Sequence, residues 1–197
     1  QDGYVKPEDT KKFAGRIFKE AQRLITLVND VIKISQLDEG KMVFAKETVD
    51  LYEETREIFK RLEQKAEEAG VHLYLYGQHR KVTTVKTILE EILFNLCDNG
   101  VKYNKQGGSL TVTIQGEEKR PQILVEDTGI GIAPEDKNRI FERFYRVDKS
   151  HSKAIGGTGL GLSIVKHGSM FLGAEVKLES TVGEGSRFIL TLPEETE

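Results

Sequence analysis

Residues 95–104 read Asn95-Leu-Cys-Asp-Asn-Gly-Val-Lys-Tyr-Asn104, within a segment whose apolar spacing predicts a helix. Asn95 and Asn99 stand four residues apart and therefore share one helix face, with Lys102 and Tyr103 a turn further along. Asparagine is a poor helix former, so two at this spacing indicate a role beyond helix formation. Amide oxygens suit Mg²⁺, lysine suits phosphate, and an aromatic ring can stack on a base. This face is a candidate nucleotide site; the alternative is a polar face in water.

Two glycine-rich segments follow this helix. Residues 127–132 read Asp-Thr-Gly-Ile-Gly-Ile, and residues 156–162 read Gly-Gly-Thr-Gly-Leu-Gly-Leu, directly before another predicted helix. Glycines ahead of a helix let backbone N–H groups converge on an anion, which the helix N-terminus also favours. Neither segment has the spacing of a dinucleotide-binding motif, and Gly40-Lys41 lacks the rest of a P-loop. Either segment alone is equally consistent with a turn, whereas the pair after residues 95–104 favours phosphate binding.

Periodicity elsewhere predicts alternating helices and strands in an irregular order. The expected segments are a strand over 42–49, a helix from Asp50 to Ala69 ended by Gly70, a strand over 71–76, a helix over 84–103, paired strands over 110–114 and 122–126, a helix over 159–172, and a hairpin of 175–180 with 187–192. Irregular mixing and late antiparallel pairs indicate an α+β sandwich.

The segment over residues 95–104 resembles the N box of sensor histidine kinases of two-component systems, and further boxes follow in order. Residues 127–132 resemble the G1 box, residues 139–146 the F box, and residues 156–162 the G2 box. The resemblance covers about residues 51–193 and is highly specific because the boxes occur in sequence. It implies a two-layer α/β sandwich, the Bergerat fold of the GHKL ATPases, with ATP and Mg²⁺ as ligands.

The resemblance also implies roles for individual residues. Asn99 would hold Mg²⁺, and Asn95 and Lys102 would support the phosphates. Tyr103 would pack beside the adenine, and Asp127 would read its amino group. The other implied nucleotide-binding residues lie in the G1, F and G2 boxes: Gly129, Gly131, Ile132, Phe144, Gly157, Thr158, Gly159, Leu160, Gly161 and Leu162.

A lid over about residues 133–158 is implied between the G1 and G2 boxes. Phe144 would anchor this lid, and Gly129 and Gly131 would let the base approach the backbone. Arg146 would reach the γ-phosphate when the lid closes, as a catalytic residue together with Asn95. A long loop of this composition is expected to be mobile until nucleotide binds.

The residue at position 95 distinguishes ATP hydrolysis from phosphotransfer to histidine within the wider fold family. That family includes gyrase, heat-shock chaperone and mismatch-repair ATPases. Those ATPases resemble one another in placing a glutamate four residues before the Mg²⁺ asparagine, where it can activate water as a general base. Here that residue is Asn95, whose amide cannot accept the proton. The resemblance thus implies a protein-histidine kinase that transfers the ATP γ-phosphate to a histidine for relay to a response regulator. A GHKL-type ATPase or a nucleotide-binding scaffold is the alternative.

Residues 7–37 carry a helical pattern about 45 Å long at 1.5 Å per residue. One apolar stripe has the alternating steps of a coiled coil, and a second widens the apolar surface. The first stripe comprises Ile17, Ala21, Leu24, Val28 and Val31, and the second comprises Phe13, Phe18, Ile25 and Ile32. The pattern predicts a bundle helix, against the alternative of a helix packed on its own domain. Residues 35–40 resemble the end of the second dimerisation helix of sensor histidine kinases.

We therefore expect two parts, residues 1–40 from a dimerisation and phosphotransfer region and residues 41–197 as the catalytic ATP-binding domain. None of the four histidines is followed by glutamate, so the phosphoacceptor is expected outside this chain, which we interpret as a fragment inactive in autophosphorylation alone. The implied partners are ATP or ADP, the dimerisation hairpin of the same or the partner protomer, and a response regulator receiver domain. The parent is expected to be a homodimer.

Composition restricts the other classes of function. Hydrophobic residues at 38% are enough for a packed core, and a net charge of −3 without a long basic run argues against nucleic acid as a partner. Cys97 is the single cysteine and therefore forms no internal disulfide. No apolar run reaches the roughly 18 to 20 residues of a membrane span. We expect a cytoplasmic domain whose full-length parent is anchored in the bacterial cell membrane.

Overall fold

The computed structural model describes residues 9–39, 44–117, 119–147 and 158–194. Its helices are α1 (Thr10–Glu39), α2 (Leu51–Ala69), α3 (Lys86–Lys102) and α5 (Gly161–Leu172), with a short 3-10 turn, η2 (Arg139–Phe141). Its strands are β1 (Glu47–Asp50), β2 (His72–Gly77), β3 (Lys81–Thr84), β4 (Ser109–Glu117), β5 (Arg120–Asp127), β6 (Glu175–Thr181) and β7 (Gly185–Thr191). Every predicted helix is present.

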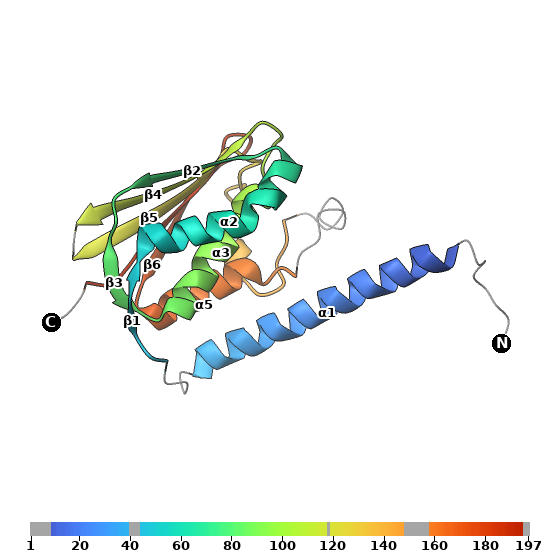
Figure 1. Ribbon diagram of the computed structural model, residues 1–197, viewed down its shortest axis with the longest axis horizontal. Helices are drawn as coiled ribbons and strands as arrows, with labels where there is room; N and C mark the ends of the chain where they lie inside the picture. The colour runs from blue at the N-terminus through green and yellow to red at the C-terminus, as the bar shows by residue number, and fades with distance from the viewer. Residues whose placement is uncertain (1–8, 40–43, 118, 148–157, 195–197) are drawn as a thin grey trace.

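A mixed sheet and one layer of helices form the predicted sandwich. The five strands lie in the order β2-β4-β5-β7-β6, with β2 and β4 parallel and the other neighbours antiparallel. Helices α2, α3 and α5 cover one face of this sheet (Figure 1). The core between the layers contains Leu93 and Leu96 of α3 with Val112 and Val125 of the central strands. This arrangement confirms the α+β fold and places the polar face of α3 beside the start of α5.

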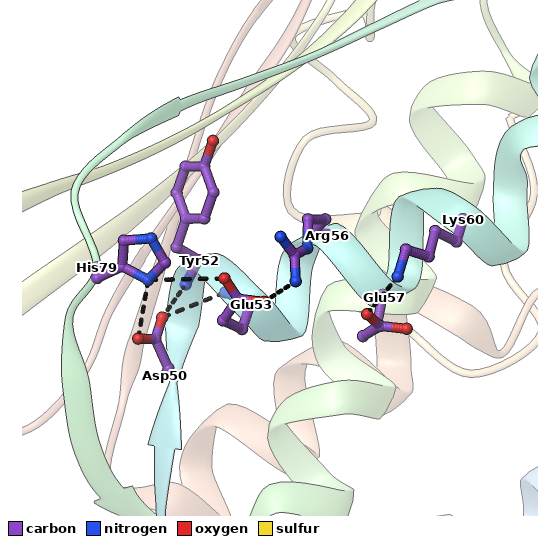
Figure 2. Close-up of polar contacts among 7 residues, drawn as sticks. All are labelled: Asp50, Tyr52, Glu53, Arg56, Glu57, Lys60 and His79. Carbon is purple, nitrogen blue, oxygen red and sulfur yellow. Dashed lines mark hydrogen bonds and ion pairs between the residues drawn. The ribbon is translucent and has the colours of Figure 1, made fainter.

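The start of α2 follows the predicted capping. Asp50 Oδ1 accepts hydrogen bonds from the N–H groups of Tyr52 at 3.0 Å and Glu53 at 3.2 Å. Asp50 Oδ2 lies 3.0 Å from His79 Nδ1, and the His79 ring packs 4.8 Å from the Tyr52 ring (Figure 2). Gly70 ends the helix with a φ of 65°, a left-handed conformation that glycine adopts without steric cost.

Two predicted boundaries were wrong. Residues 81–84 form β3, which pairs antiparallel with β1, so α3 begins at Lys86 rather than near Thr84. The expected strand over 42–49 is paired only from Glu47, because β3 is four residues long and offers no partner to residues 44–46. Residues 42–43 and the expected helix start at residue 7 lie outside the described residues.

Helix α1 runs beside the sandwich on its helical side and extends beyond it (Figure 1). Its apolar contact with the sandwich is made by Ile34, which is 1% exposed and forms a small cluster with Leu160 and Ile164, and by Leu27 next to them. Both predicted apolar stripes stay exposed, with Ile17 at 70% and Phe18 at 63%. The helix therefore docks on its own domain through a third face, and its two stripes remain uncovered.

Candidate nucleotide site

One cavity of about 760 Å³ opens between α3, the start of α5, the segment before residue 148, and α1. This volume is in the range of small-molecule and cofactor sites. Most of the predicted site residues line it: Asn95, Asn99, Lys102, Tyr103, Asp127, Gly131, Ile132, Arg146, Thr158, Gly159, Gly161 and Leu162. Gly129, Phe144 and Leu160 do not line it, and Gly157 lies outside the described residues.

The polar face of α3 meets the start of α5 at one end of the cavity. Asn95 Nδ2 donates a hydrogen bond to the Glu91 carbonyl at 2.8 Å, one turn earlier in α3. A Cβ on Gly161 would lie 2.7 Å from Asn95 Oδ1 and 3.9 Å from Asn99 Nδ2. A side chain at position 161 would displace the Asn95 amide, so glycine lets the start of α5 approach the two asparagines. A helix N-terminus beside polar side chains suits an anion such as phosphate.

The other end of the cavity contains a largely buried carboxylate. Asp127 Oδ1 accepts a hydrogen bond from the Gly129 N–H at 2.8 Å. Burial raises the pKa of the Asp127 carboxyl, although the N–H groups of Gly129 and Ser186 act in the opposite direction. Such a carboxylate can accept a hydrogen bond from an amino group of a ligand.

Gly129 and Gly131 are required by the protein's own packing. A Cβ on Gly129 would lie 2.4 Å from the Tyr103 carbonyl oxygen, and one on Gly131 would lie 2.0 Å from the Thr181 carbonyl oxygen. Gly131 also has a φ of 68°. These glycines let residues 127–132 lie against neighbouring backbone, and their expected role of admitting a base stays a prediction.

Basic side chains gather at the cavity edge near the end of α3. Lys102 Nζ lies 5.1 Å from the centre of the Tyr103 ring. Burial lowers the pKa of the Lys102 ammonium; Asp98 opposes this shift, and the positive charges of Lys65 and Arg146 add to it. Burial also raises the pKa of Tyr103. Lys102 and Arg146 thus place two positive charges at this edge of the cavity, which favours an anionic ligand there.

Two predicted binding residues have other surroundings. Phe144 is 55% exposed and has a positive φ of 64°, and its N–H donates to the Gly159 carbonyl at 3.0 Å. Leu160 is fully buried against Ile34 of α1. The first residue therefore supports the glycine segment through its backbone, and the second is part of the contact with α1.

Tyr145 shapes the segment between the G1 and G2 boxes and also lines the cavity. Its hydroxyl donates to Asp136 Oδ1 at 2.5 Å, and the Arg139 guanidinium lies 4.2 Å from its ring centre. The hydrogen bond to Asp136 raises the pKa of the tyrosine. No role was predicted for Tyr145 from the sequence.

Helix α1 supplies cavity residues that the sequence did not indicate: Thr26, Asp30 and Lys33. Asp30 Oδ2 accepts a hydrogen bond from Thr158 Oγ1 at 3.0 Å, across 128 positions of sequence. Lys33 Nζ binds both carboxylate oxygens of Glu91, at 2.8 and 2.9 Å. No local pattern relates residues this far apart, so only the folded chain reveals these contacts.

Comparison with known proteins agrees with this geometry. The family model described as "Histidine kinase-, DNA gyrase B-, and HSP90-like ATPase" matches residues 84–196. The sensor-like histidine kinase SenX3 of Mycobacterium tuberculosis is 35% identical over 187 residues, which are 94% of this chain and 46% of that protein. The chain thus spans about half the length of the curated relatives it matches.

Solved structures show the same fold. Full-length ShkA in complex with AMPPNP superposes with a TM-score of 0.83 at 26% identity, over 96% of this chain and 40% of that one. Histidine kinase ThkA, in complex with the response regulator protein TrrA, superposes with a TM-score of 0.74 at 23% identity, over 97% and 53% of the two chains. The chain therefore belongs to the family of histidine kinase-, DNA gyrase B- and HSP90-like ATPases, and the relatives that it matches are sensor histidine kinases.

Proposed function

We propose that this chain is the ATP-binding catalytic portion of a sensor histidine kinase. It would transfer the γ-phosphate of ATP to a histidine on a dimerisation hairpin, of its own or the partner protomer, for relay to a response regulator receiver domain. The observation that carries the proposal is the close meeting of Asn95 and Asn99 with Gly161, in the cavity that also holds Asp127. The AMPPNP bound to ShkA and the response regulator bound to ThkA support the ligand and the partner.

The cavity offers different chemistry to the two parts of the nucleotide. Asp127 would accept a hydrogen bond from the adenine amino group beside Tyr103. Lys102 and Arg146, with the N-terminus of α5, would hold the phosphates. Adenine and phosphates would thus bind at opposite ends of one site.

The Asn99 side-chain amide is suited to act as a weak ligand of Mg²⁺. Among the described residues there is no group of three His, Cys, Asp or Glu side chains that could hold a metal alone. Mg²⁺ prefers hard oxygen ligands and usually keeps several waters while binding substrate phosphates. The Asn99 amide oxygen would therefore be one ligand of the ion, and nucleotide phosphates would be others. The bound ion would neutralise phosphate charge.

Asn95 favours phosphotransfer over hydrolysis. Its Nδ2 is engaged by the Glu91 carbonyl, and the remaining amide oxygen cannot accept a proton from water as a carboxylate does. Bound ATP would persist until an imidazole nitrogen attacks the γ-phosphorus. The bond to the β,γ-bridging oxygen then breaks, a phosphorus–nitrogen bond forms, the imidazole N–H proton is released, and ADP leaves.

Calorimetry with ATP and ADP, with and without Mg²⁺, tests the site. Asn99→Ala should weaken Mg²⁺-dependent binding about tenfold or more, since mutating even a residue that only supports a metal ligand typically costs about 10- to 100-fold in metal affinity. Asn29→Ala, an exposed asparagine of α1 that does not line the cavity, is the matched control. Unchanged affinity in Asn99→Ala would refute the assignment of Asn99.

Incubation with γ-labelled ATP tests the reaction. Without a general base, worth about 10²- to 10⁴-fold, the chain alone should neither release phosphate at an ATPase-like rate nor gain acid-labile phosphate. A separately supplied dimerisation hairpin carrying a His-Glu motif should become phosphorylated, inefficiently because the linkage is absent. Rapid phosphate release that Asn95→Ala abolishes would favour the ATPase alternative.

We further propose that residues 1–40 belong to the dimerisation region of a homodimeric, membrane-anchored parent and residues 41–197 to its catalytic domain. The exposed stripes of α1 support the first assignment, because a four-helix bundle would cover them. In the described part of the chain no helix is both long and apolar enough to cross a bilayer. This chain carries one helix of that region, so light scattering should show a monomer or a weak dimer. A tight dimer at all concentrations would contradict this expectation.

A further inference from the structure

Asp30 brings a carboxylate from α1 to the start of α5. Its Oδ2 accepts the hydrogen bond from Thr158 Oγ1 at 3.0 Å, and that hydroxyl in turn accepts one from the Leu160 N–H at 3.3 Å. Leu160 directly precedes α5 and makes no side-chain capping bond, and the first turn of α5 contains no acidic residue. Asp30 is thus linked through one hydroxyl to the positive end of this helix.

The same place is where phosphates of a nucleotide are proposed to bind. Thr158 and Asp30 line the cavity together with Gly161, Asn95 and Asn99. A carboxylate and a phosphate that share one helix N-terminus repel each other, because like charges a few ångströms apart disfavour the charged forms. Burial raises the pKa of the Asp30 carboxyl, and Glu91 adds to this while the Thr158 hydrogen bond and Lys33 oppose it. Burial and Glu91 thus disfavour the charged form of Asp30, and a phosphate placed beside it would disfavour that form further.

Contacts at other positions of α1 hold the helix, and with it Asp30, in this position. Ile34 is buried against Leu160, and Lys33 binds the Glu91 carboxylate. Asp38 Oδ1 lies 2.5 Å from His167 Nδ1, and Asp38 Oδ2 also binds Arg143. Asp30 therefore stays beside the glycine segment as long as α1 is docked.

We propose that Asp30 is a specificity-determining residue that makes the docked chain discriminate against ATP relative to ADP. The inference rests on the proposed nucleotide site. ATP carries one more phosphate than ADP, so it adds more negative charge near Asp30. Binding of ATP and docking of α1 then oppose each other, and by linkage each weakens the other by the same factor.

Calorimetry with saturating Mg²⁺ tests this on the unmodified chain, Asp30→Asn and Glu20→Gln. Asparagine keeps an oxygen that accepts the Thr158 hydrogen bond and removes only the charge. Asp30→Asn should raise ATP affinity about tenfold, within the range of ordinary coupling energies, and ADP affinity much less. Glu20→Gln removes one charge from the same helix at an exposed position that pairs with Arg23 of α1 and does not line the cavity, so it should leave the ratio of ATP to ADP affinity unchanged.

The outcomes separate the two proposals. An unchanged ratio of ATP to ADP affinity in Asp30→Asn, with binding intact, overturns this inference and leaves the proposed function standing. Failure of the unmodified chain to bind either nucleotide refutes the proposed function itself. A ratio shifted equally by Glu20→Gln would overturn the assignment to Asp30.

A distance measurement provides an independent readout of docking. Spin labels on Gln22→Cys in α1 and Gln64→Cys in α2 lie at exposed positions, whereas Cys97 is fully buried and stays unlabelled. ATP with Mg²⁺ should lengthen or broaden the distance distribution more than ADP does, and Asp30→Asn should remove that difference. An ATP-saturated chain with an unchanged distribution would refute the antagonism.

Discussion

The same kind of periodic apolar pattern is buried in the sandwich and exposed in α1. In α3 the periodic apolar residues Leu93 and Leu96 are at most 1% exposed, whereas in α1 the equally periodic Leu24 and Val28 are 57% and 52% exposed. Periodicity states which side chains share a helix face. It does not state what covers that face, which depends on neighbours elsewhere in the chain or in another chain.

The docked face of α1 differs from its apolar stripes in a further respect. It combines buried Ile34 with the charged residues Asp30, Lys33 and Asp38, each bound to a partner on the sandwich. Interfaces between domains that are this polar are typical of contacts that open and close. The α1 contact is thus suited to reversible docking, while the sandwich core is not.

The largest expected difference between the two regions concerns thiol reactivity. Burial, with a contribution from Asp98, raises the pKa of the Cys97 thiol to about 12. Ellman's reagent should label Cys97 in the folded chain about 10³-fold or more slowly than in urea, since only the rare unfolded fraction reacts. Leu24→Ala in α1 should leave this rate unchanged. Fast labelling of the folded chain would show that the sandwich opens far more readily than its packing indicates.

Paired leucine substitutions test the comparison energetically. Leu93→Ala should cost about 2–5 kcal/mol of unfolding free energy, because it leaves a cavity in the core. Leu24→Ala should change it by less than about 0.5 kcal/mol, as for other exposed positions. Urea unfolding followed by circular dichroism measures both. Comparable losses would break the comparison and show that the stripe of α1 is covered in solution.

A smaller effect is expected at the start of α2. Asp50→Ala should cost about 1 kcal/mol because two N–H groups lose their cap. Glu57→Ala, which removes only an exposed pair with Lys60, should cost less (Figure 2). Urea unfolding at neutral pH compares the two variants, and equal losses would contradict the capping role.

The Asp50 contribution should also depend on pH. Burial alone would raise the pKa of the Asp50 carboxyl, but the Glu53 N–H, His79 and the Tyr52 N–H hold it below its ordinary value. A lowered folded-state pKa means that the stabilisation is present above the unfolded-state value of about 3.9. It is lost as the pH falls through the lower folded-state value. The difference between unmodified chain and Asp50→Ala should therefore shrink in acid titrations.

The smallest expected effect has the opposite sign. Ser169 Oγ is buried without a hydrogen-bond partner among the described residues, so Ser169→Ala should raise stability by up to about 1 kcal/mol. Ser163 in the same helix donates to the Leu160 carbonyl at 2.8 Å, so Ser163→Ala should lower stability instead. Thermal unfolding compares the two. A loss in Ser169→Ala would reveal a partner for its hydroxyl.

Local chemistry made much of the sandwich predictable. Asp50 and Gly70 mark the two ends of α2 because capping and left-handed backbone are properties of single residues. The strand β3 was not predicted from the sequence, because its four residues depend on pairing with β1, which lies 30 or more positions earlier. Short strands of this kind are stabilised mainly by their partner.

The candidate site likewise combines features that are local in the sequence with contacts between distant segments. By itself the sequence determined that Asn95 and Asn99 share a helix face and that glycines precede α5, because helical spacing and glycine freedom are local properties. Only the tertiary structure decided that this face meets Gly161, that Gly129 is needed beside the Tyr103 carbonyl, and that Asp30 reaches Thr158. Those contacts join distant segments, and their distances depend on how α1, α3 and α5 pack, which no local pattern encodes.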